Sequence, residues 1–358
     1  MAVSRAPSKE PTRPEGVPDD AILKLIPVPA EAAGMRADVF LQSRLRRTSR
    51  TRAQMILEKS AYRFDGKRLS ASDRMREGEV VALWRDPFEG DEEAPPMPVL
   101  YEDEHLLVID KPPLVAVHPT ARYHRHTVIK RLEAERPGEF LALIHRLDRE
   151  TSGVLLLARS LESERAFKRD LEKRTDASKR APVDGDDDSE EATNFEKEYL
   201  AIARGVPPEG MVSLPLELDP NNALRVKMRV AAPGTGLVAR TGVTVLETRG
   251  GYSLVACALE TGRQHQIRVH LAALGCPVIG DKLYGVDERL LARAADGLLR
   301  PEDLALLELS RHALHAHRYR LRHAVTGLPL ELVSPLPRDL AEFWAGSLPG
   351  GAPGGASR

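Results

Sequence analysis

The chain of 358 residues lacks most of the features that mark secreted, membrane-spanning or nucleotide-dependent proteins. It has two cysteines, Cys257 and Cys276, whose spacing does not suggest a pair, so we expect buried or incidental thiols in a reducing compartment. No apolar run comes close to the length of about 20 residues that is needed to cross a bilayer. The first residues are followed by prolines and charged residues instead of the apolar core of a signal peptide. A phosphate-binding loop of the Walker type is also missing. These absences predict a cytoplasmic protein that uses no nucleotide cofactor.

The formal net charge of −1 does not by itself favour a nucleic-acid partner. The charge is unevenly distributed, however. Residues 36–85 hold 13 Lys or Arg against 6 Asp or Glu, a local net charge of +7, whereas residues 181–193 hold 6 acidic and no basic residues. Because local charge decides how a surface meets phosphates, we interpret the neutral total as the sum of a basic module and a separate acidic insert.

The basic segment has a recognisable internal order. Phe40 and Leu41 suit the apolar face of one helix, and Ser49 is suited to cap a second. Short strands are predicted at residues 62–64 and 78–83. Arginines gather where the two helices meet, and we expect four of them to contact phosphates: Arg46, Arg47, Arg50 and Arg52.

Residues 145–153 read HRLDRETSG and lie between two apolar runs, residues 141–144 and 154–157. This pattern predicts a strand, a polar loop and a second strand. The loop sets one acid, Asp148, among basic and small residues, and charged loops on a rigid scaffold are common places for catalysis. An isolated aspartate more often caps a turn or pairs with a neighbouring arginine, so other motifs must decide between the two interpretations.

A second polar motif, GRQHQIRVHL, occupies residues 262–271 and is followed by glycine and proline signals that end a helix. In the predicted helix the apolar residues recur as a buried stripe, while Gln264 and Arg268 share another face. Arg268 would then be aimed reproducibly at a neighbouring acid.

Two further segments, residues 195–203 and 108–119, contain residues that bear on the function. Residues 195–203, FEKEYLAIA, alternate as a strand that includes Tyr199. A strand tyrosine more often packs than acts, but an aromatic face can stack on an unpaired base. Residues 108–119 read VIDKPPLVAVHP.

Together these segments resemble the RluA-type family of RNA pseudouridine synthases. The HRLDRETSG segment matches the family's HRLDxxTSG motif at every fixed position, and the later segments match its GRxHQIRxH and KxYxA motifs. Residues 110–119 resemble its DKPxGLxVHP segment imperfectly, since Leu114 stands where the family usually has glycine. Residues 36–85 likewise resemble the S4-type RNA-binding domain, with Ser60 and Asp65 in place of the usual Gly and Asn, and this resemblance implies that Arg46, Arg47, Arg50 and Arg52 bind RNA.

The resemblance implies isomerisation of uridine to pseudouridine, in which the N1–C1′ bond breaks and the uracil rejoins through C5. It also implies a role for each residue: Asp148 is the nucleophile and Arg268 its ion-pair partner. Tyr199 stacks on the base and is a candidate for proton transfer, and Arg146 fills the space that the flipped nucleotide leaves. A paired base is beyond the reach of a carboxylate, so the target must be flipped out or already unpaired. Whether the aspartate attacks C1′, attacks C6 or promotes glycal formation stays open.

The histidines raise a competing metal hypothesis. His312, His315 and His317 lie in one short stretch, and the last two would share one face of a strand. Because no Cys or carboxylate cluster of ligand spacing lies nearby, we predict no metal site.

Two other functions stay open. An RNA-binding ribosome-assembly factor without catalytic activity would not need the set of Asp148, Tyr199 and Arg268, and a hydrolase would use Asp148 with a metal or a histidine such as His145. We predict the synthase, acting as a monomer on large-subunit ribosomal RNA, with transfer RNA as a second candidate substrate.

The predicted fold class is α+β. A small S4-type α+β module precedes a catalytic core with a mixed, largely antiparallel sheet and flanking helices. We expect, in chain order, a disordered tail at 1–20, the module at 36–85, a linker at 86–98, the catalytic domain at 99–345 with a disordered acidic insert at 175–194, and a second tail at 350–358.

Overall fold

The computed structural model describes residues 10–19, 21–45, 48–85, 95–119, 126–177, 195–222, 226–287, 289–296 and 298–346. The chain divides into two compact units. The first comprises Met1–Asp91, Ala121–His124 and Asp219–Lys227, and the second comprises the rest. Each unit has a large hydrophobic cluster of its own.

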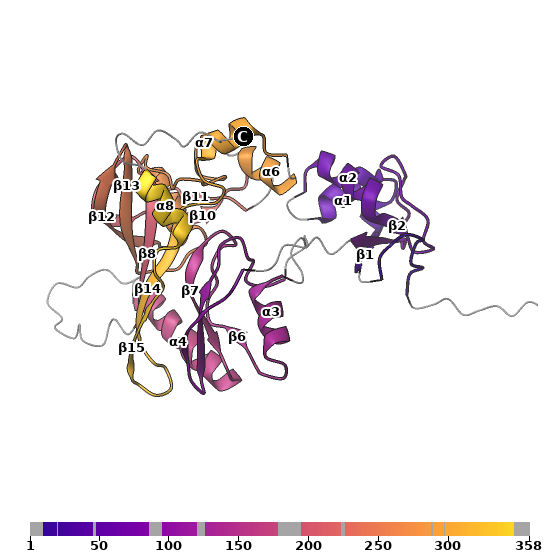
Figure 1. Cartoon of the computed structure of the whole chain (residues 1–358). Helices are drawn as coiled ribbons and strands as arrows, with labels where there is room; N and C mark the ends of the chain where they lie inside the picture. Colours follow the sequence, from indigo (N-terminus) through magenta and orange to yellow (C-terminus); the bar gives the residue numbers. More distant parts are fainter. Residues whose placement is uncertain are drawn as a thin grey trace, which may run out of the picture. The chain divides into compact units, whose positions relative to one another are not determined.

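The first unit contains a three-stranded antiparallel sheet and two helices (Figure 1). Its elements are β1 (Ile22–Pro27), a 3-10 helix (Ala30–Ala32), α1 (Ala37–Arg44), α2 (Arg50–Ser60), β2 (Ala61–Arg63) and β3 (Val80–Arg85). As predicted, the Ser49 hydroxyl caps α2, where it accepts the Arg52 N–H at 3.2 Å. Phe40 and Leu41 of α1 are fully buried and pack with Leu57 of α2 in the core of this unit.

The unit starts earlier than the predicted boundary at residue 36. β1, which we did not predict, pairs with β3 along its whole length. Its apolar run is interrupted by Lys24, which hides the strand from a periodicity argument. Arg46 and Arg47 lie outside the described residues, as do residues 86–94 of the predicted linker.

The prediction of a disordered tail is wrong for residues 10–19. The Thr12 N–H donates to the carbonyl of Phe64 at 3.0 Å, and the Arg13 guanidinium lies 5.3 Å from the centre of the Trp84 ring. A cation over an indole face is a favourable contact that composition alone does not reveal. The remaining residues of the two predicted tails, 1–9, 20 and 350–358, lie outside the described residues.

The second unit is built on a ten-stranded sheet. Its strands are β4 (Val99–Glu102), β5 (Leu106–Lys111), β6 (Ala142–Leu143), β7 (Ser152–Ala158), β8 (Phe195–Arg204), β9 (Gly210–Ser213), β12 (Arg240–Arg249), β13 (Tyr252–Leu259), β14 (Leu314–Arg322) and β15 (Pro329–Val333). A separate ribbon pairs β10 (Leu216–Leu218) with β11 (Met228–Val230). The helices are α3 (Val128–Glu135), α4 (Leu161–Ala177), α5 (Gln266–Ala273), α6 (Arg289–Asp296), α7 (Pro301–Leu307) and α8 (Arg338–Gly346).

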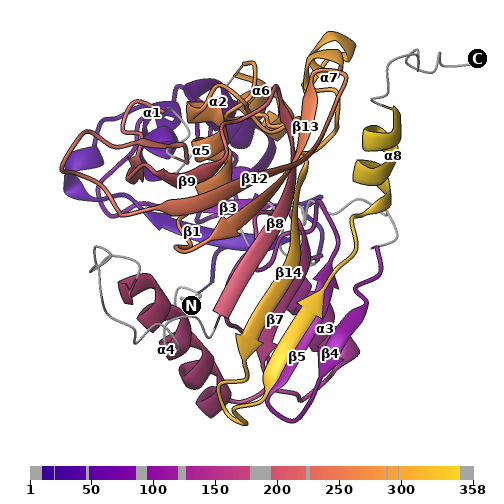
Figure 2. The same cartoon turned by 90° about the vertical axis from the view of Figure 1, so that its left-hand side faces the viewer.

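The strand order along the sheet is β4-β5-β7-β14-β8-β13-β12-β9, with β6 on β7 and β15 on β14. All of these pairings are antiparallel except that of β7 with β14, which lie side by side near the middle of the sheet (Figure 2). The sheet is therefore mixed and largely antiparallel, and the α+β fold class is confirmed.

The β7–β14 contact requires a glycine. Gly153 lies opposite Ala316 with a φ of +109°, and a Cβ at this position would come within 2.2 Å of the Ala316 carbonyl oxygen. Only glycine lets the two backbones approach this closely. Because β7 is buried at every residue, the polar loop before it is anchored to the most rigid part of the sheet.

Local side-chain and turn signals set several boundaries. Ser160 caps α4 by accepting the Ser163 N–H at 3.1 Å, and glycine turns join β12 to β13 and β14 to β15. α4 continues to Ala177, so the first part of the expected disordered insert is helical, and residues 178–194 lie outside the described residues. Within the described part of the chain, none of the helices is both long and apolar enough to span a membrane.

Candidate active site

Asp148 lies in the predicted polar loop, between β6 and β7. Its neighbour Leu147 is buried, and the Thr151 N–H donates to the Asp148 carbonyl at 3.1 Å, which closes a turn. The Asp148 side chain is 31% exposed. The loop therefore presents a fixed carboxylate that a substrate can reach.

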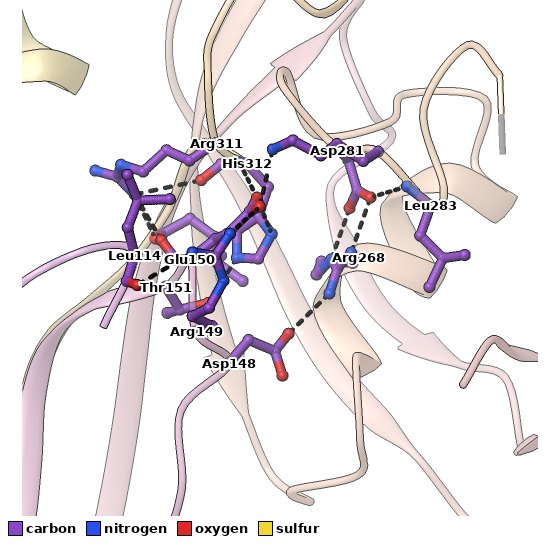
Figure 3. A network of polar contacts seen from close by, with 12 residues as sticks. Leu114, Asp148, Arg149, Glu150, Thr151, Arg268, Asp281, Leu283, Arg311 and His312 are labelled. Carbon is purple, nitrogen blue, oxygen red and sulfur yellow. Dashed lines mark hydrogen bonds and ion pairs between the residues drawn. The ribbon is translucent and has the colours of Figure 1, made fainter. Parts of the chain in front are cut away.

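Arg268 of α5 contacts Asp148, as predicted. Its Nη1 lies 2.8 Å from Asp148 Oδ2, and its other edge holds Asp281, with Nε 2.6 Å from Oδ2 and Nη2 2.9 Å from Oδ1 (Figure 3). The Asp281 carboxylate is fully buried and also accepts the N–H groups of Leu283 and Tyr284. Arg268 is thus fixed between two carboxylates, one buried and one accessible.

The start of α5 differs from the prediction. The helix begins at Gln266, so Gln264 precedes it and does not share a helical face with Arg268. The Gln266 amide explains this start, because its Oε1 accepts the Thr261 hydroxyl at 2.8 Å and the Arg263 N–H at 3.0 Å. These side-chain bonds replace a first helical turn. His265 consequently adopts a left-handed backbone conformation, with φ of 58°.

The electrostatic surroundings keep Asp148 ionised. Burial tends to raise its pKa, but His265 and Arg268 outweigh that effect and hold the pKa at about 2. Burial opposes ionisation of Asp281 in the same way, and Arg268 again lowers the pKa well below its usual range. An ionised carboxylate at neutral pH is the state that a nucleophile needs.

His265 and Tyr284 complete the surroundings of Asp148. His265 Nε2 lies 3.8 Å from Asp148 Oδ1, and His265 Nδ1 lies 2.8 Å from the Tyr284 hydroxyl. That hydroxyl accepts the Met228 N–H at 2.8 Å, and the Tyr284 ring lies 5.1 Å from the Arg268 guanidinium carbon. We had not predicted a role for either residue; the GRQHQIRVHL motif draws attention to His265, but no local signal marks Tyr284.

A second polar network, around Glu150 and Thr151, holds the loop in place (Figure 3). The Glu150 carboxylate accepts the Lys282 ammonium at 2.8 Å and the His312 N–H at 3.1 Å. The Glu150 carbonyl accepts the buried Arg311 guanidinium at 3.1 Å, and the Thr151 hydroxyl bonds His312 Nε2 at 2.8 Å. We predicted none of these contacts, because each joins residues more than 100 positions apart.

Lys111 connects the DKP segment to the same loop. Its buried ammonium donates to the carbonyls of Pro112, Val115 and Arg149, at 2.8, 2.9 and 3.2 Å. Burial, with the charges of nearby arginines, lowers the pKa of Lys111 to about 7. Leu114, where the sequence differs from the family's DKP segment, lies inside this turn and has a φ of +66°.

Tyr199 lies close to the loop through the register of the sheet. Ala316 is the partner of both Gly153 on β7 and Tyr199 on β8. The Tyr199 side chain is buried, and its hydroxyl bonds that of Tyr319 at 2.7 Å. Arg146, by contrast, is exposed.

Three other histidines that the sequence singled out, His315, His317 and His145, have structural partners. His315 Nδ1 bonds the Ser152 hydroxyl at 3.0 Å and its Nε2 bonds the Ser334 carbonyl at 3.0 Å, so both nitrogens are engaged. His317 also bonds the Ser334 carbonyl, at 2.8 Å. His145 accepts the Leu156 N–H at 3.3 Å, which orients it toward β7.

Comparison with known proteins agrees with this site. Residues 105–273 match the family described as RNA pseudouridylate synthase. This range includes Asp148, Tyr199 and Arg268.

Relatives match over most of the chain. The chain is 33% identical to "Ribosomal large subunit pseudouridine synthase D" of Xanthomonas campestris, over 90% of this chain and 92% of the relative. It is 35% identical to an "Uncharacterized RNA pseudouridine synthase" of Chloroflexus aurantiacus, over 88% and 91%. The solved structure of human RNA Pseudouridylate Synthase Domain Containing 4 is similar with a TM-score of 0.50 at 27% identity, covering 69% of this chain and 91% of that one. The chain therefore belongs to the RluA-type family of RNA pseudouridine synthases.

Proposed function

We propose that this enzyme converts uridines of large-subunit ribosomal RNA to pseudouridine, with Asp148 as the nucleophile. The observation that supports this assignment best is the ion pair between Asp148 and Arg268, because Arg268 is itself clamped by Asp281. The clamp leaves one face of the Asp148 carboxylate accessible while its charge is maintained. A reactive acid needs both properties.

The other predicted site residues receive supporting roles. Tyr199 stacks on the flipped base and is a candidate for proton transfer; its bond to the Tyr319 hydroxyl offers a route by which a proton leaves or reaches it. Arg146 is exposed beside the loop, where a planar cation can occupy the gap in the RNA stack and contact phosphate.

The first unit supplies RNA affinity in this proposal. Arg46, Arg47, Arg50 and Arg52 contribute positive charge that contacts phosphates and does not read bases. The names of the relatives favour large-subunit ribosomal RNA as the target. The enzyme would then act as a monomer in the cytoplasm.

The decisive experiment measures tritium release from RNA labelled at uridine C5. Wild type should release tritium from large-subunit ribosomal RNA faster than from bulk transfer RNA, and Asp148→Asn should release none while it binds RNA within about threefold of wild type. Asp287→Asn is the matched control, since Asp287 pairs with Arg289. Turnover by Asp148→Asn would remove Asp148 as nucleophile, and preferential release from transfer RNA would overturn the proposed target.

A further inference from the structure

The two oxygens of the Asp148 carboxylate have different surroundings. Oδ2 accepts the Arg268 hydrogen bond at 2.8 Å. Oδ1 faces His265 Nε2 at 3.8 Å, which is too long for a hydrogen bond. Oδ1 therefore receives no hydrogen bond from either of these two neighbours, and we take it as the attacking atom.

The orientation of the His265 ring is fixed from two sides. Its backbone is held in a left-handed conformation where α5 starts, and its Nδ1 bonds the Tyr284 hydroxyl at 2.8 Å. The Tyr284 oxygen already accepts the Met228 N–H, so its own hydrogen is available for His265 Nδ1. In the neutral ring the remaining proton is then on Nε2.

The field of Asp148 favours the same tautomer. A bare lone pair on Nε2 would face a carboxylate oxygen, whereas an Nε2–H presents a positive hydrogen to it. His265 thus directs a donor into the space beside Oδ1. The side chains of His265 and Asp148 are 13% and 31% exposed, so a base placed against Asp148 can reach both.

The reaction creates a need for such a donor. When the N1–C1′ bond breaks, its electron pair stays on the uracil, and the negative charge spreads over N1 and the carbonyl oxygens. A preorganised donor aimed at developing charge typically accelerates a reaction by about 10²–10³-fold. Arg268 is less suited to this task, because three of its N–H groups already bond Asp281 and Oδ2, whereas His265 Nε2 faces Oδ1.

We propose that His265 is a further catalytic residue, whose Nε2–H donates a hydrogen bond to a carbonyl oxygen of the detached uracil. Tyr284 is its positioning residue. The bond holds the base against the site between cleavage at N1 and rejoining at C5. This inference rests on the proposed role of Asp148 as nucleophile.

Two amide substitutions separate this role from a structural one. In His265→Gln the longer side chain places an amide N–H near the position of Nε2. In His265→Asn the amide reaches only to the level of Nδ1, so the contact with Tyr284 is kept and the donor beside Oδ1 is lost. Asparagine also tolerates a left-handed backbone, so strain does not explain a defect of this variant.

The readout is single-turnover tritium release at saturating RNA, measured with RNA affinity and thermal unfolding. The single-turnover rate of His265→Asn should be about 10²–10³-fold below that of wild type, with RNA affinity within about threefold. The rate of His265→Gln should be at least about tenfold higher than that of His265→Asn. His105→Asn is the matched control, because His105 lies at the other end of β7 from the site. It precedes Leu106, whose partner Ala158 is at the opposite end of β7 from Gly153.

Several outcomes would overturn the inference. A wild-type rate in His265→Asn, or equal rates in the two amide variants, would leave His265 with a structural role. Failure of the nucleophile proposal is distinguishable, since it appears as turnover by Asp148→Asn.

Tyr284 is tested by a double-mutant cycle. Tyr284→Phe keeps the ring beside Arg268 and removes the bond to His265, and it should slow single turnover by about tenfold in wild type but hardly at all in the His265→Asn background. Equal slowing in both backgrounds would show that Tyr284 does not act through His265.

Discussion

Arg268 is the residue on which the charge of the site depends. Its side chain is 8% exposed and lies between two carboxylates, so the loss of solvent is offset only while both partners stay in place. Buried ion pairs of this kind contribute little net stability as a whole, but removing one partner is expensive because a desolvated charge is left unbalanced. The arrangement thus fixes geometry more than it stabilises the fold.

Asp281→Asn should therefore affect both stability and rate. We expect the free energy of unfolding to fall by about 3 kcal/mol, because the Arg268 guanidinium loses a bidentate anionic partner in a buried site. The single-turnover rate should fall as well, since the aim of Arg268 at Asp148 is no longer fixed. Urea unfolding and tritium release measure the two effects. Asp287→Asn, which removes a carboxylate from a more exposed pair, should cost much less; equal losses would contradict the argument.

The pH dependence of stability follows from the same carboxylates. Asp148 has a folded pKa of about 2 against an ordinary value of 3.8, and the pKa of Asp281 is lowered in the same direction. Below pH 4 the unfolded chain binds more protons than the folded one, so stability is present above the unfolded pKa and is lost as the pH falls toward 2. Urea midpoints between pH 6 and pH 2.5 should show this loss, and Asp281→Asn should show less of it. An unchanged slope in the variant would argue against Asp281 as a source.

Leu114 introduces strain at the scale of a single turn. A leucine with a φ of +66° meets a clash between its Cβ and the backbone that glycine avoids. The Leu114 side chain is 42% exposed, so little packing offsets this strain. What holds the turn is its backbone: Lys111 donates to the neighbouring carbonyls, and Arg149 donates to the Leu114 carbonyl at 3.2 Å.

Leu114→Gly should accordingly be more stable than wild type by about 1 kcal/mol, since relief of the left-handed strain exceeds the entropy that glycine adds to the unfolded chain. Gly153→Ala is the opposite control: the added Cβ meets the Ala316 backbone and should destabilise strongly. Chemical unfolding of both variants tests the pair. A destabilised Leu114→Gly would mean that the leucine side chain contributes more through packing than its exposure suggests.

The predictability of each element depends on the distance over which its structure is decided. The Ser49 cap and the loop around Asp148 follow from neighbours in the sequence, and they were predicted. The late start of α5 depends on the Gln266 amide and on a turn that hydrophobic spacing does not describe.

The site as a whole was predicted in part. The motifs led to Asp148 and Arg268, and the structure joins them. Glu150 was missed because its partners, Lys282 and His312, come from distant segments of the chain. Asp281 lies only 13 residues after Arg268, but in a turn that hydrophobic spacing does not describe. Roles for Tyr199 and Arg146 stay predictions.

At the scale of the whole molecule, the basic charge of the first unit is not uniformly available to RNA. The fully buried Asp38 accepts Arg36, Arg50 and Gln54, so Arg50 has a structural task beside any contact with phosphate. The expected effect of an arginine substitution therefore depends on its partner. Arg52 is not among these partners of Asp38, so its substitution leaves the buried carboxylate paired and is the better test of binding.

Arg52→Ala should weaken RNA binding and reduce the slope of log affinity against log salt concentration by about 1, as expected for one lost phosphate contact. The single-turnover rate at saturating RNA should stay the same, because Asp148, the proposed nucleophile, lies in the second unit. Binding titrations at several salt concentrations measure the slope. Arg74→Ala is the matched control, because the Arg74 guanidinium donates to the Gly34 carbonyl. Identical slopes for both variants would exclude Arg52 from the RNA contact.

The parallel contact of β7 with β14 sets an order of events during synthesis. Thr151 and Ser152 are held by His312 and His315, which the ribosome adds more than 160 residues later. Closing so long a loop is slow, so the Asp148 carboxylate exists in the nascent chain well before the residues that hold its loop. A chain that ends before β14 therefore has the acid without its supports, and the arrangement around Asp148 can form only after β14 has been synthesised.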